Sequence, residues 1–575
     1  MLASTPSGGS DANSYMFAHL RRFMPSFSMK TRVYMVSSFM ALGGFLFGYQ
    51  FGVLPGILTM YSFHQDTNIQ DNSTSLTSTL MAGAVAGALA AGVLADLIGR
   101  RGLIAVSTAL FMGADVLQVG ADDIIKLYVG RVITGISIGA LSMVVPLYQS
   151  EISPKEMRGR LVSIQQFAIA CGICVSYWVD YAVLDVTSVS NWRLAFGLPL
   201  IPALIYLAGT LVLPKSPRYL IYKHHDRQAL EVLAFVRGDG TINHPDVLME
   251  YVEIKQSIRF EEKYGSKHFW RLFRKGADNN RKRLLLGMAV QIFQQLTGAN
   301  ALLLYAPLIF RASGIQGKST TLLANGISGL VNLVFTIPPM ITIDRWGRRP
   351  TLIVGSIACC VCLTIMTVIA AVTGLTDNIA SMHVLDASTT DPTEVDESIR
   401  QIDHQASIGF LVMMYMFVAC YALTWGPAGW IYPTELYSQD VRARALGFTT
   451  AANWLFNFGV TMLTPLMYVH IKWKAFVVYA VFCFVMAIVV HRYFPETMGK
   501  SLEEIDLIFS GNFNYYDLSV HHPQTAAAAL SQLNRTSRSR NALLGGFNQL
   551  VSARSNEHIP SSTHSSELDS GRGSE

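Results

Sequence analysis

The chain has 575 residues, of which 51% are hydrophobic and only 14% are charged, and its mean hydropathy is +0.34. Because a soluble domain carries roughly 25% charged residues, this composition excludes a soluble protein of several domains. The net charge of +5 does not indicate a nucleic-acid partner, since the basic residues lie in short loops between apolar runs rather than on one solvated face.

Long apolar runs follow one another along the chain. A membrane-spanning helix needs about 20 residues, and twelve runs are near that length or longer. They lie at about 33–58, 79–98, 102–120, 124–148, 161–183, 193–213, 284–310, 320–342, 351–373, 407–433, 446–469 and 473–494. The sequence therefore predicts an all-α membrane protein with twelve transmembrane helices.

The twelve runs form two groups of six, and the polar stretch between the groups contains no spanning run. The end of the chain is rich in Ser, Thr, Arg and Gln and cannot bury enough apolar surface to fold. We predict five parts: an N-terminal tail (1–32), a first six-helix bundle (33–213), a helical loop domain (214–283), a second six-helix bundle (284–494) and a C-terminal tail (495–575) that is disordered after about 511.

Basic residues favour one side of the predicted helices. Gly-Arg-Arg follows both the second and the eighth run, whereas the loop at 374–406 on the opposite side is acidic. Because basic loops tend to remain in the cytoplasm, both tails and the loop domain are predicted to be cytoplasmic. In the first outer loop, Asn72 begins an Asn-Ser-Thr acceptor for N-glycosylation.

Three motifs occur once in each half of the chain, in the same order. An Asp precedes both Gly-Arg-Arg motifs, a Glu precedes an Arg-x-Arg motif by seven residues in both halves, and Pro214-Lys-Ser-Pro-Arg has a counterpart in Pro495-Glu-Thr-Met-Gly. Parallel repeats of six helices are typical of transporters whose halves move about a site at the middle of the membrane.

The repeated charges predict ion pairs that form when the cytoplasmic helix ends come together. The alternative is that the basic residues set the topology and nothing more, but this leaves the acids at matching positions unexplained. We predict a gating network of Asp96, Arg100, Arg101, Glu151, Arg158, Arg160, Asp344, Arg345, Arg348, Arg349, Glu435 and Arg442.

Uncharged polar side chains lie inside several of the apolar runs. Gln291, Gln294, Gln295 and Asn300 recur at helical steps in the seventh run. Polar groups are costly in a membrane and tend to face a cavity, and an amide can both donate to and accept from a sugar hydroxyl. For any single amide, hydrogen bonding between helices is the alternative.

Several motifs together carry a family resemblance. They are Gly-Arg-Arg twice, PKSPRYL at 214–220, QQLTGAN at 294–300, GPAGWIYPTEL at 426–436 and PETMGKSLEE at 495–504. Together these motifs resemble the sugar porter family of the major facilitator superfamily, and its fungal hexose transporters most of all. The resemblance covers roughly 35–510. It implies two six-helix bundles of the major facilitator fold and transport of a monosaccharide, expected to be glucose, across the plasma membrane by alternating access.

By motif match, the same resemblance implies a set of side chains that contact the sugar. They are Gln166, Gln294, Gln295, Asn300, Asn332, Trp430 and Asn457.

The chain departs from this family at two positions. Proton-coupled relatives carry Asp where this chain has Gln50, next to an Arg that corresponds to Arg131, and Lys215 replaces a Glu. Because Gln has no proton to exchange, the first expectation is facilitative transport. A proton symporter whose acid the sequence does not identify is one alternative, with Asp115 and Asp180 as buried candidates. A sugar sensor that does not transport is another.

The sequence indicates no chemistry beyond transport. No nucleophile and base pair, metal-ligand cluster or phosphate-binding loop stands out. We therefore predict neither enzymatic activity nor a cofactor or metal, and the expected partners are a small neutral sugar and the lipid bilayer.

Overall fold

The computed structural model describes eight long stretches and three short ones. They are residues 28–67, 73–184, 191–237, 241–264, 272–273, 279–312, 318–374, 404–438, 441–500, 505 and 508–509. The regular structure in these stretches is helical throughout. Asn72, almost all of the acidic loop at 374–406, and the tail predicted to be disordered lie outside the described residues.

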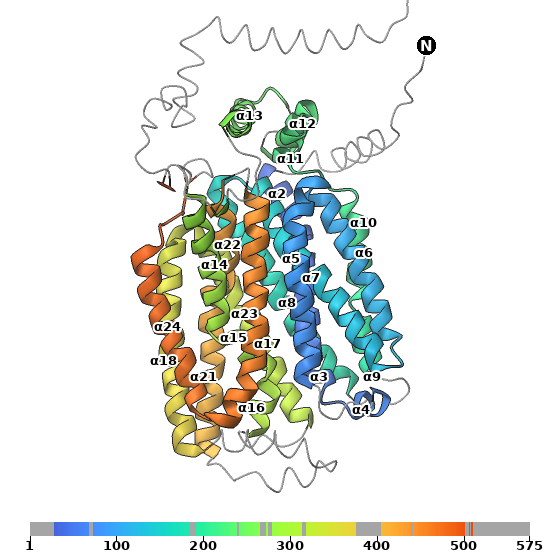
Figure 1. Ribbon diagram of the computed structural model, residues 1–575, viewed down its shortest axis with the longest axis vertical. Coiled ribbons are helices and arrows are strands. Elements are labelled where there is room, and N and C mark those ends of the chain that lie inside the picture. Colours follow the sequence, from blue (N-terminus) through green and yellow to red (C-terminus); the bar gives the residue numbers. More distant parts are fainter. Residues whose placement is uncertain are drawn as a thin grey trace, which may run out of the picture. The chain divides into compact units, whose positions relative to one another are not determined.

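The first half of the chain makes six passes in alternating directions (Figure 1). Two of the passes are interrupted near their middle, one where Ala41 separates two helices and the other at Leu198 and Pro199. The helices are α2 (Met29–Met40) with α3 (Leu42–Ile57), α5 (Ser73–Leu97), α6 (Arg100–Val119), α7 (Ile124–Ile152), α8 (Arg158–Val183), and α9 (Asn191–Gly197) with α10 (Leu200–Thr210), and the short α4 (Tyr61–Thr67) follows the first pass.

The second half makes six further passes. The first is broken at Gly298, whose φ of +81° suits glycine because it has no Cβ. The fourth is broken at Thr424. The helices are α14 (Asn280–Leu296) with α15 (Ala299–Leu304) and α16 (Ala306–Ala312), α17 (Lys318–Trp346), α18 (Arg348–Thr373), α21 (His404–Leu423) with α22 (Trp425–Leu436), α23 (Arg442–His470) and α24 (Lys474–Tyr493).

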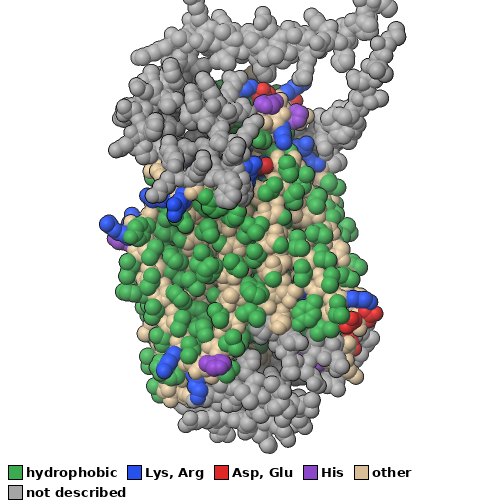
Figure 2. All heavy atoms as spheres, in the orientation of Figure 1, with side chains coloured by type: hydrophobic (Ala, Val, Ile, Leu, Met, Phe, Trp, Pro, Cys, Tyr) green, Lys and Arg blue, Asp and Glu red, His purple; other side chains and the backbone are tan. Residues whose placement is uncertain are grey.

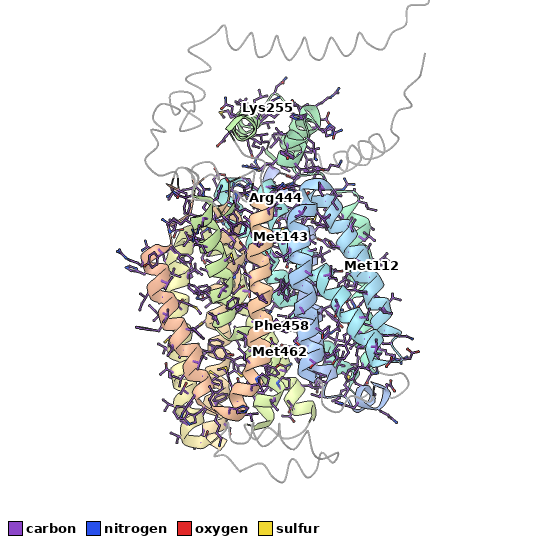
Figure 3. The ribbon with its side chains drawn as sticks, in the orientation of Figure 1. Met112, Met143, Lys255, Arg444, Phe458 and Met462 are labelled. Carbon is purple, nitrogen blue, oxygen red and sulfur yellow. The ribbon has the colours of Figure 1, made fainter. Side chains whose placement is uncertain are left out.

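Ten of these passes are long and apolar enough to cross a membrane by composition alone. The other two are α14 to α16 and α23, which run alongside the rest and carry four of the seven residues predicted to contact the sugar (Figure 1). Figure 3 shows that α23 extends from Arg444 at its upper end past Phe458 and Met462. On the face seen in Figure 2, hydrophobic side chains form a broad band and the visible charges gather above and below it. The prediction of twelve transmembrane helices is therefore confirmed.

Three shorter helices lie between the two halves in sequence: α11 (Pro217–Tyr222), α12 (Asp226–Arg237) and α13 (Pro245–Tyr264). The first begins at Ser216, whose side chain accepts the N–H of Tyr219, with Pro217 at the first helical position. Apolar side chains of all three helices form a small core of their own, made of Leu220, Ile221, Ala229, Val232, Ile254 and Ile258. In Figure 1 they lie above the end of the bundles that carries Arg100 and Arg348, which we call the basic end.

The two halves meet along α5 with α23 and along α8 with α17. At the first contact the backbones are so close that a Cβ on Gly447 would lie 2.8 Å from the Cα of Gly92. Small residues permit such close packing of helices in membranes. The space between the halves is therefore narrow near the basic end.

Candidate functional site

A cluster of amides holds the break between α21 and α22 in place. The Gln294 amide donates to the carbonyls of Trp425 and Gly426 at 3.0 and 3.2 Å, and Gln291 donates to the carbonyl of Gly429 at 3.0 Å. Asn453 of α23 donates to the side-chain oxygens of both glutamines, at 2.9 Å to Gln294. Because Pro433 has no N–H, the Gly429 carbonyl lacks its partner four residues on, and the Gln291 amide supplies one. The Gln294 amide ties the first turn of α22 to α14.

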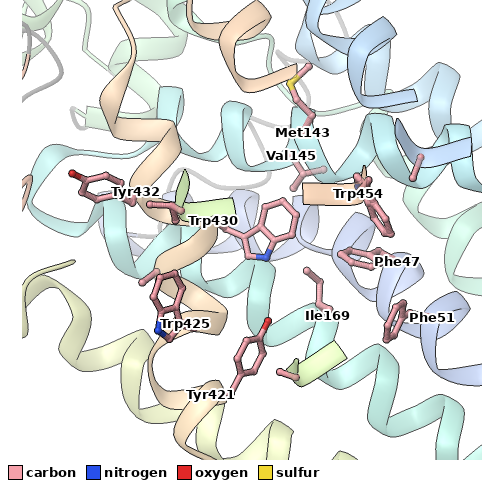
Figure 4. Close-up of a cluster of buried hydrophobic side chains, with 14 of the residues drawn as sticks. Phe47, Phe51, Met143, Val145, Ile169, Tyr421, Trp425, Trp430, Tyr432 and Trp454 are labelled. Atoms are coloured by element: carbon pink, nitrogen blue, oxygen red, sulfur yellow. The ribbon is translucent and has the colours of Figure 1, made fainter. Parts of the chain in front are cut away.

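A second polar contact joins the two halves. Trp430 of α22 donates its indole N–H to the side-chain oxygen of Gln166 in α8 at 3.1 Å. Phe47 of α3 packs edge-on against Trp430, with ring centroids 6.3 Å apart, and against Trp454 of α23 at 5.0 Å. Figure 4 shows these three rings together, contributed by both halves of the chain. They form an aromatic wall beside the Gln166 amide.

A third contact spans the break between α14 and α15. Asn300 donates to the side-chain oxygen of Gln295 at 2.7 Å. Both residues were predicted to contact the sugar, and the structure places them on either side of Gly298. Their mutual hydrogen bond leaves the carbonyl oxygen of Asn300 and the NH₂ of Gln295 as further bonding groups.

Some buried polar atoms have no hydrogen bond within the described part of the chain. They include the side-chain oxygens of Asn332 and Asn457, the hydroxyl of Thr461 and both amide atoms of Gln165. Such atoms are rare because an unpaired polar group in an apolar surrounding is costly. They are the groups that a hydroxylated ligand or water would satisfy. Sequence reasoning missed Gln165, although its burial in an apolar run next to Gln166 is the same signal.

The predicted gating charges form the same arrangement in each half. Arg100 lies 3.2 Å from Asp96 and 3.0 Å from Glu151. Arg348 repeats this with Asp344 at 3.0 Å and Glu435 at 2.8 Å. The second oxygen of each glutamate accepts a hydroxyl from the loop motif, Ser216 in the first half and Thr497 in the second.

One pair in the network connects the halves directly. The Asp344 carboxylate accepts the backbone N–H of Arg160 at 3.0 Å and lies 3.5 Å from its guanidinium nitrogen. Each of these charges lies at the basic end, so the contact closes that end of the space between the bundles.

The remaining predicted gating residues have different surroundings. Arg101 donates to the carbonyls of Leu211 and Leu213, Arg349 donates to the carbonyl of His491, and Arg442 donates to the carbonyl of Tyr437. Arg158 is buried and Arg345 is the penultimate residue of α17. These contacts to backbone carbonyls anchor helix ends within one half.

Gln50, the first position at which the chain departs from the family, belongs to a network of charged side chains. Arg131 of α7 donates to the side-chain oxygen of Gln50 at 3.1 Å, and the Gln50 amide donates to Asp115 of α6 at 2.6 Å. Arg131 thus contacts the neutral amide of Gln50. A carboxylate also belongs to this network, because Asp115 reaches Gln50 from another helix.

The comparisons with known proteins agree with this geometry. A family model described as "Sugar (and other) transporter" matches residues 36–509. The chain belongs to the sugar porter family. Sugar porters move their substrate without changing it chemically, so this member is not an enzyme. The family also confirms the predicted major facilitator fold and the membrane location.

Curated relatives cover most of this sugar porter. It is 32% identical over 491 residues to the MFS glucose transporter mfs1 of Aspergillus flavus, which covers 83% of this chain and 89% of the relative. It is also 34% identical over 493 residues to the high glucose sensor RGT2 of Saccharomyces cerevisiae, with 83% of this chain but 60% of the sensor covered.

Solved structures show the same fold. The proton:xylose symporter XylE bound to 6-bromo-6-deoxy-D-glucose matches with a TM-score of 0.69 and 26% identity, covering 84% of this chain and 100% of that one. An inward-open structure of XylE matches with a lower TM-score of 0.57.

Proposed function

We propose that this sugar porter carries a hexose, with glucose as the first candidate, across the plasma membrane by alternating access. In this proposal both termini and the helices α11 to α13 are cytoplasmic, so the basic end is the inner gate. The observation that carries the proposal is the hydrogen bond from Trp430 to Gln166, which joins the halves beside an aromatic wall and unpaired buried amides.

The chemistry of these groups suits a neutral sugar. The unpaired oxygens of Asn332 and Asn457 accept hydrogen bonds, and the Gln165 amide both accepts and donates. Every sugar hydroxyl offers both functions, while the rings of Phe47 and Trp430 can pack against the C–H face of a pyranose. No charged side chain belongs to this group of residues, which agrees with an uncharged substrate.

Alternating access follows from the contacts between the halves. The Arg160 and Asp344 pair closes the inner end and must separate before a sugar can leave toward the cytoplasm. A sugar that takes over the Gln166 and Trp430 groups would replace one link between the halves with bonds to itself. Binding energy can then shift the balance between the two conformations.

Glucose as the substrate is supported by the relatives, among them the glucose transporter of A. flavus. Gln50 taken alone predicts facilitative transport, because it has no ionisable group. The contact between Gln50 and Asp115 favours the alternative of a proton-coupled carrier. The likeness to RGT2 keeps a glucose sensor as a further alternative, because that relative is named as a sensor.

Transport by the purified chain in proteoliposomes tests the proposal. Vesicles loaded with unlabelled glucose should take up radiolabelled glucose by counterflow. Excess galactose, fructose, xylose or a polyol should reduce this uptake to the extent that each fits the binding site. A sensor that does not transport would bind glucose without counterflow. Counterflow of a charged solute in place of a sugar would contradict the proposed substrate class.

A further inference from the structure

We propose that Asp115 is the proton-binding residue of this carrier and that the Gln50 amide relays its charge state to Arg131. This inference rests on the proposed sugar transport. It adds that a proton gradient supplies the energy for that transport. It places the carboxylate on α6, whereas proton-coupled relatives carry it at the position of Gln50. The network thus retains an acid and an arginine, with an amide between them.

The geometry of the three side chains supports a relay. Asp115 and Gln50 are fully buried, and Arg131 is 1% exposed. An amide has a donor at one end and an acceptor at the other. Here the donor end of Gln50 faces the carboxylate at 2.6 Å and the acceptor end faces the guanidinium at 3.1 Å. The amide is therefore oriented by opposite charges on its two sides.

Asp115 also has a free position for a proton. One carboxylate oxygen accepts from Gln50, and the other makes no hydrogen bond to the described part of the chain. A buried carboxylate with a single hydrogen bond is costly to keep charged. A proton can bind to the second oxygen without breaking an existing bond, so the geometry permits protonation while the network stays assembled.

The charged and titratable groups around Asp115 do not neutralise it in another way. From α7, Arg131 attracts the carboxylate through space and lies over the Phe196 ring, while Lys126 pairs with the exposed Asp122. From α3, Tyr49 donates its hydroxyl to the carbonyl of Ala195 at 2.7 Å.

The other neighbouring helices contribute groups with partners elsewhere. Arg193 of α9 donates to the carbonyl of Ala121, and Tyr206 of α10 donates to the carbonyl of Met40. On α5, Asp96 pairs with Arg100. Tyr128 of α7 packs with the apolar cluster around Trp192. Arg131 is therefore the cation that responds to the charge of Asp115.

In the proposed step one proton moves, and the covalent bond that forms is the O–H bond on Asp115. A proton from the outer solution binds the free oxygen of Asp115 when the carrier is open outward, and the same proton leaves to the cytoplasm when it is open inward. While Asp115 is protonated, the carboxyl group is neutral and its hold on the Gln50 amide weakens. The indirect link between Arg131 and α6 weakens with it, so α6 can move more easily relative to α3 and α7.

Asp180 offers a matched control. Among the described residues it is the other acid with no exposed surface, on α8, and its oxygens lie against Gly56 without a hydrogen bond to those residues. Its carboxylate reaches neither Gln50 nor Arg131 through any hydrogen bond in the described part of the chain. Replacing it tests whether any buried acid would produce the same result.

The experiment uses the full chain in proteoliposomes at zero membrane potential. Counterflow of glucose at equal pH measures sugar exchange, and accumulation under an inward gradient of two pH units measures coupling. A gradient of that size can support about a hundredfold accumulation at one proton per sugar. A pH-sensitive dye inside the vesicles reports proton entry when glucose is added.

We expect the unmodified carrier to accumulate glucose at least tenfold and to admit protons with it. Asp115→Asn should reduce accumulation to the equilibrium ratio of about one and abolish glucose-dependent proton entry, with counterflow still measurable. Asp180→Asn should accumulate glucose like the unmodified carrier. The double variant Gln50→Asp, Asp115→Asn moves the carboxylate next to Arg131 and should restore accumulation, even if the single variant proves unstable.

Counterflow without accumulation in the unmodified carrier would overturn the proton proposal and leave sugar transport standing. Accumulation by Asp115→Asn at the unmodified level, or its loss in Asp180→Asn instead, would overturn the assignment of Asp115. Absence of counterflow in the unmodified carrier would overturn the proposed function and this inference together.

Discussion

Asp344 in the second half accepts the backbone N–H of Arg160 in the first half at 3.0 Å, while its other oxygen lies 3.0 Å from the guanidinium of Arg348. The same carboxylate thus holds a helix start in one bundle and an ion pair in the other. In the proposed alternating access the halves separate at this point when the basic end opens, so the stability of the closed state is expected to depend on this carboxylate.

Asp344→Asn should shift the carrier toward the inward-open conformation. The substitution keeps the size of the side chain but weakens two charge-assisted contacts, each worth roughly 1.5–3 kcal/mol. Because 1.4 kcal/mol corresponds to a tenfold change, the inward-open population should rise about tenfold or more. Alkylation of cysteines introduced beneath the gate, applied from the basic end, measures this change. Arg227→Ala removes an exposed pair with Glu231 and is the control. Equal labelling of both variants would contradict the role of Asp344 in closing the basic end.

Asn457→Ala should weaken glucose binding without harming the fold. The Asn457 oxygen has no hydrogen bond to the described residues, so its removal breaks no hydrogen bond of that atom within them. A lost hydrogen bond to a neutral hydroxyl costs about 0.5–1.5 kcal/mol, which predicts a twofold to tenfold weaker apparent affinity. Glucose binding by calorimetry and the melting temperature in detergent should be measured together. A lower melting temperature with unchanged affinity would assign Asn457 a structural role instead.

Gln294 and Gln295 should differ although they are neighbours in the chain. Gln294→Ala removes bonds to the backbone of α22 and to Asn453, so it should lower stability by about 1–3 kcal/mol. Gln295→Ala removes the acceptor of the hydrogen bond that Asn300 donates, and its main effect should be on sugar affinity. Thermal unfolding and glucose binding of both variants give the comparison. The reverse pattern would show that Gln294 is the sugar ligand and Gln295 the structural residue.

Arg237 should hold the helices α12 and α13 at the end of α7. Its guanidinium binds Glu250 through two nitrogens, at 2.5 and 2.9 Å, and donates to the carbonyl of Ile152 at 2.6 Å. Arg237→Ala should make residues 217–264 much more sensitive to limited proteolysis, because the side chain is largely buried and joins two helices. Arg227→Ala, on the exposed side of α12, is again the control, and equal cleavage of both would refute the role.

The number of passes and the family could be predicted from the sequence because both depend on local properties. A window of apolar residues is recognisable whatever it packs against, as every backbone group in a membrane helix is satisfied within the helix. The repeated Gly-Arg-Arg and Glu motifs likewise carried enough information to predict the Arg100 and Arg348 ion pairs. The sequence could not show that Arg101 turns to the carbonyls of Leu211 and Leu213, since adjacent residues on a helix face different neighbours.

The functions of individual polar side chains depended on contacts between distant segments. Helical spacing places Gln291, Gln294 and Gln295 on related faces of α14, but it does not say whether a face meets another helix or the sugar. Asp115 is the clearest case, because it is 65 residues from Gln50 and joins its network only where α3, α6 and α7 converge. Hydrogen bonds act over about 3 Å, so only the tertiary structure decides which of the buried polar groups meet.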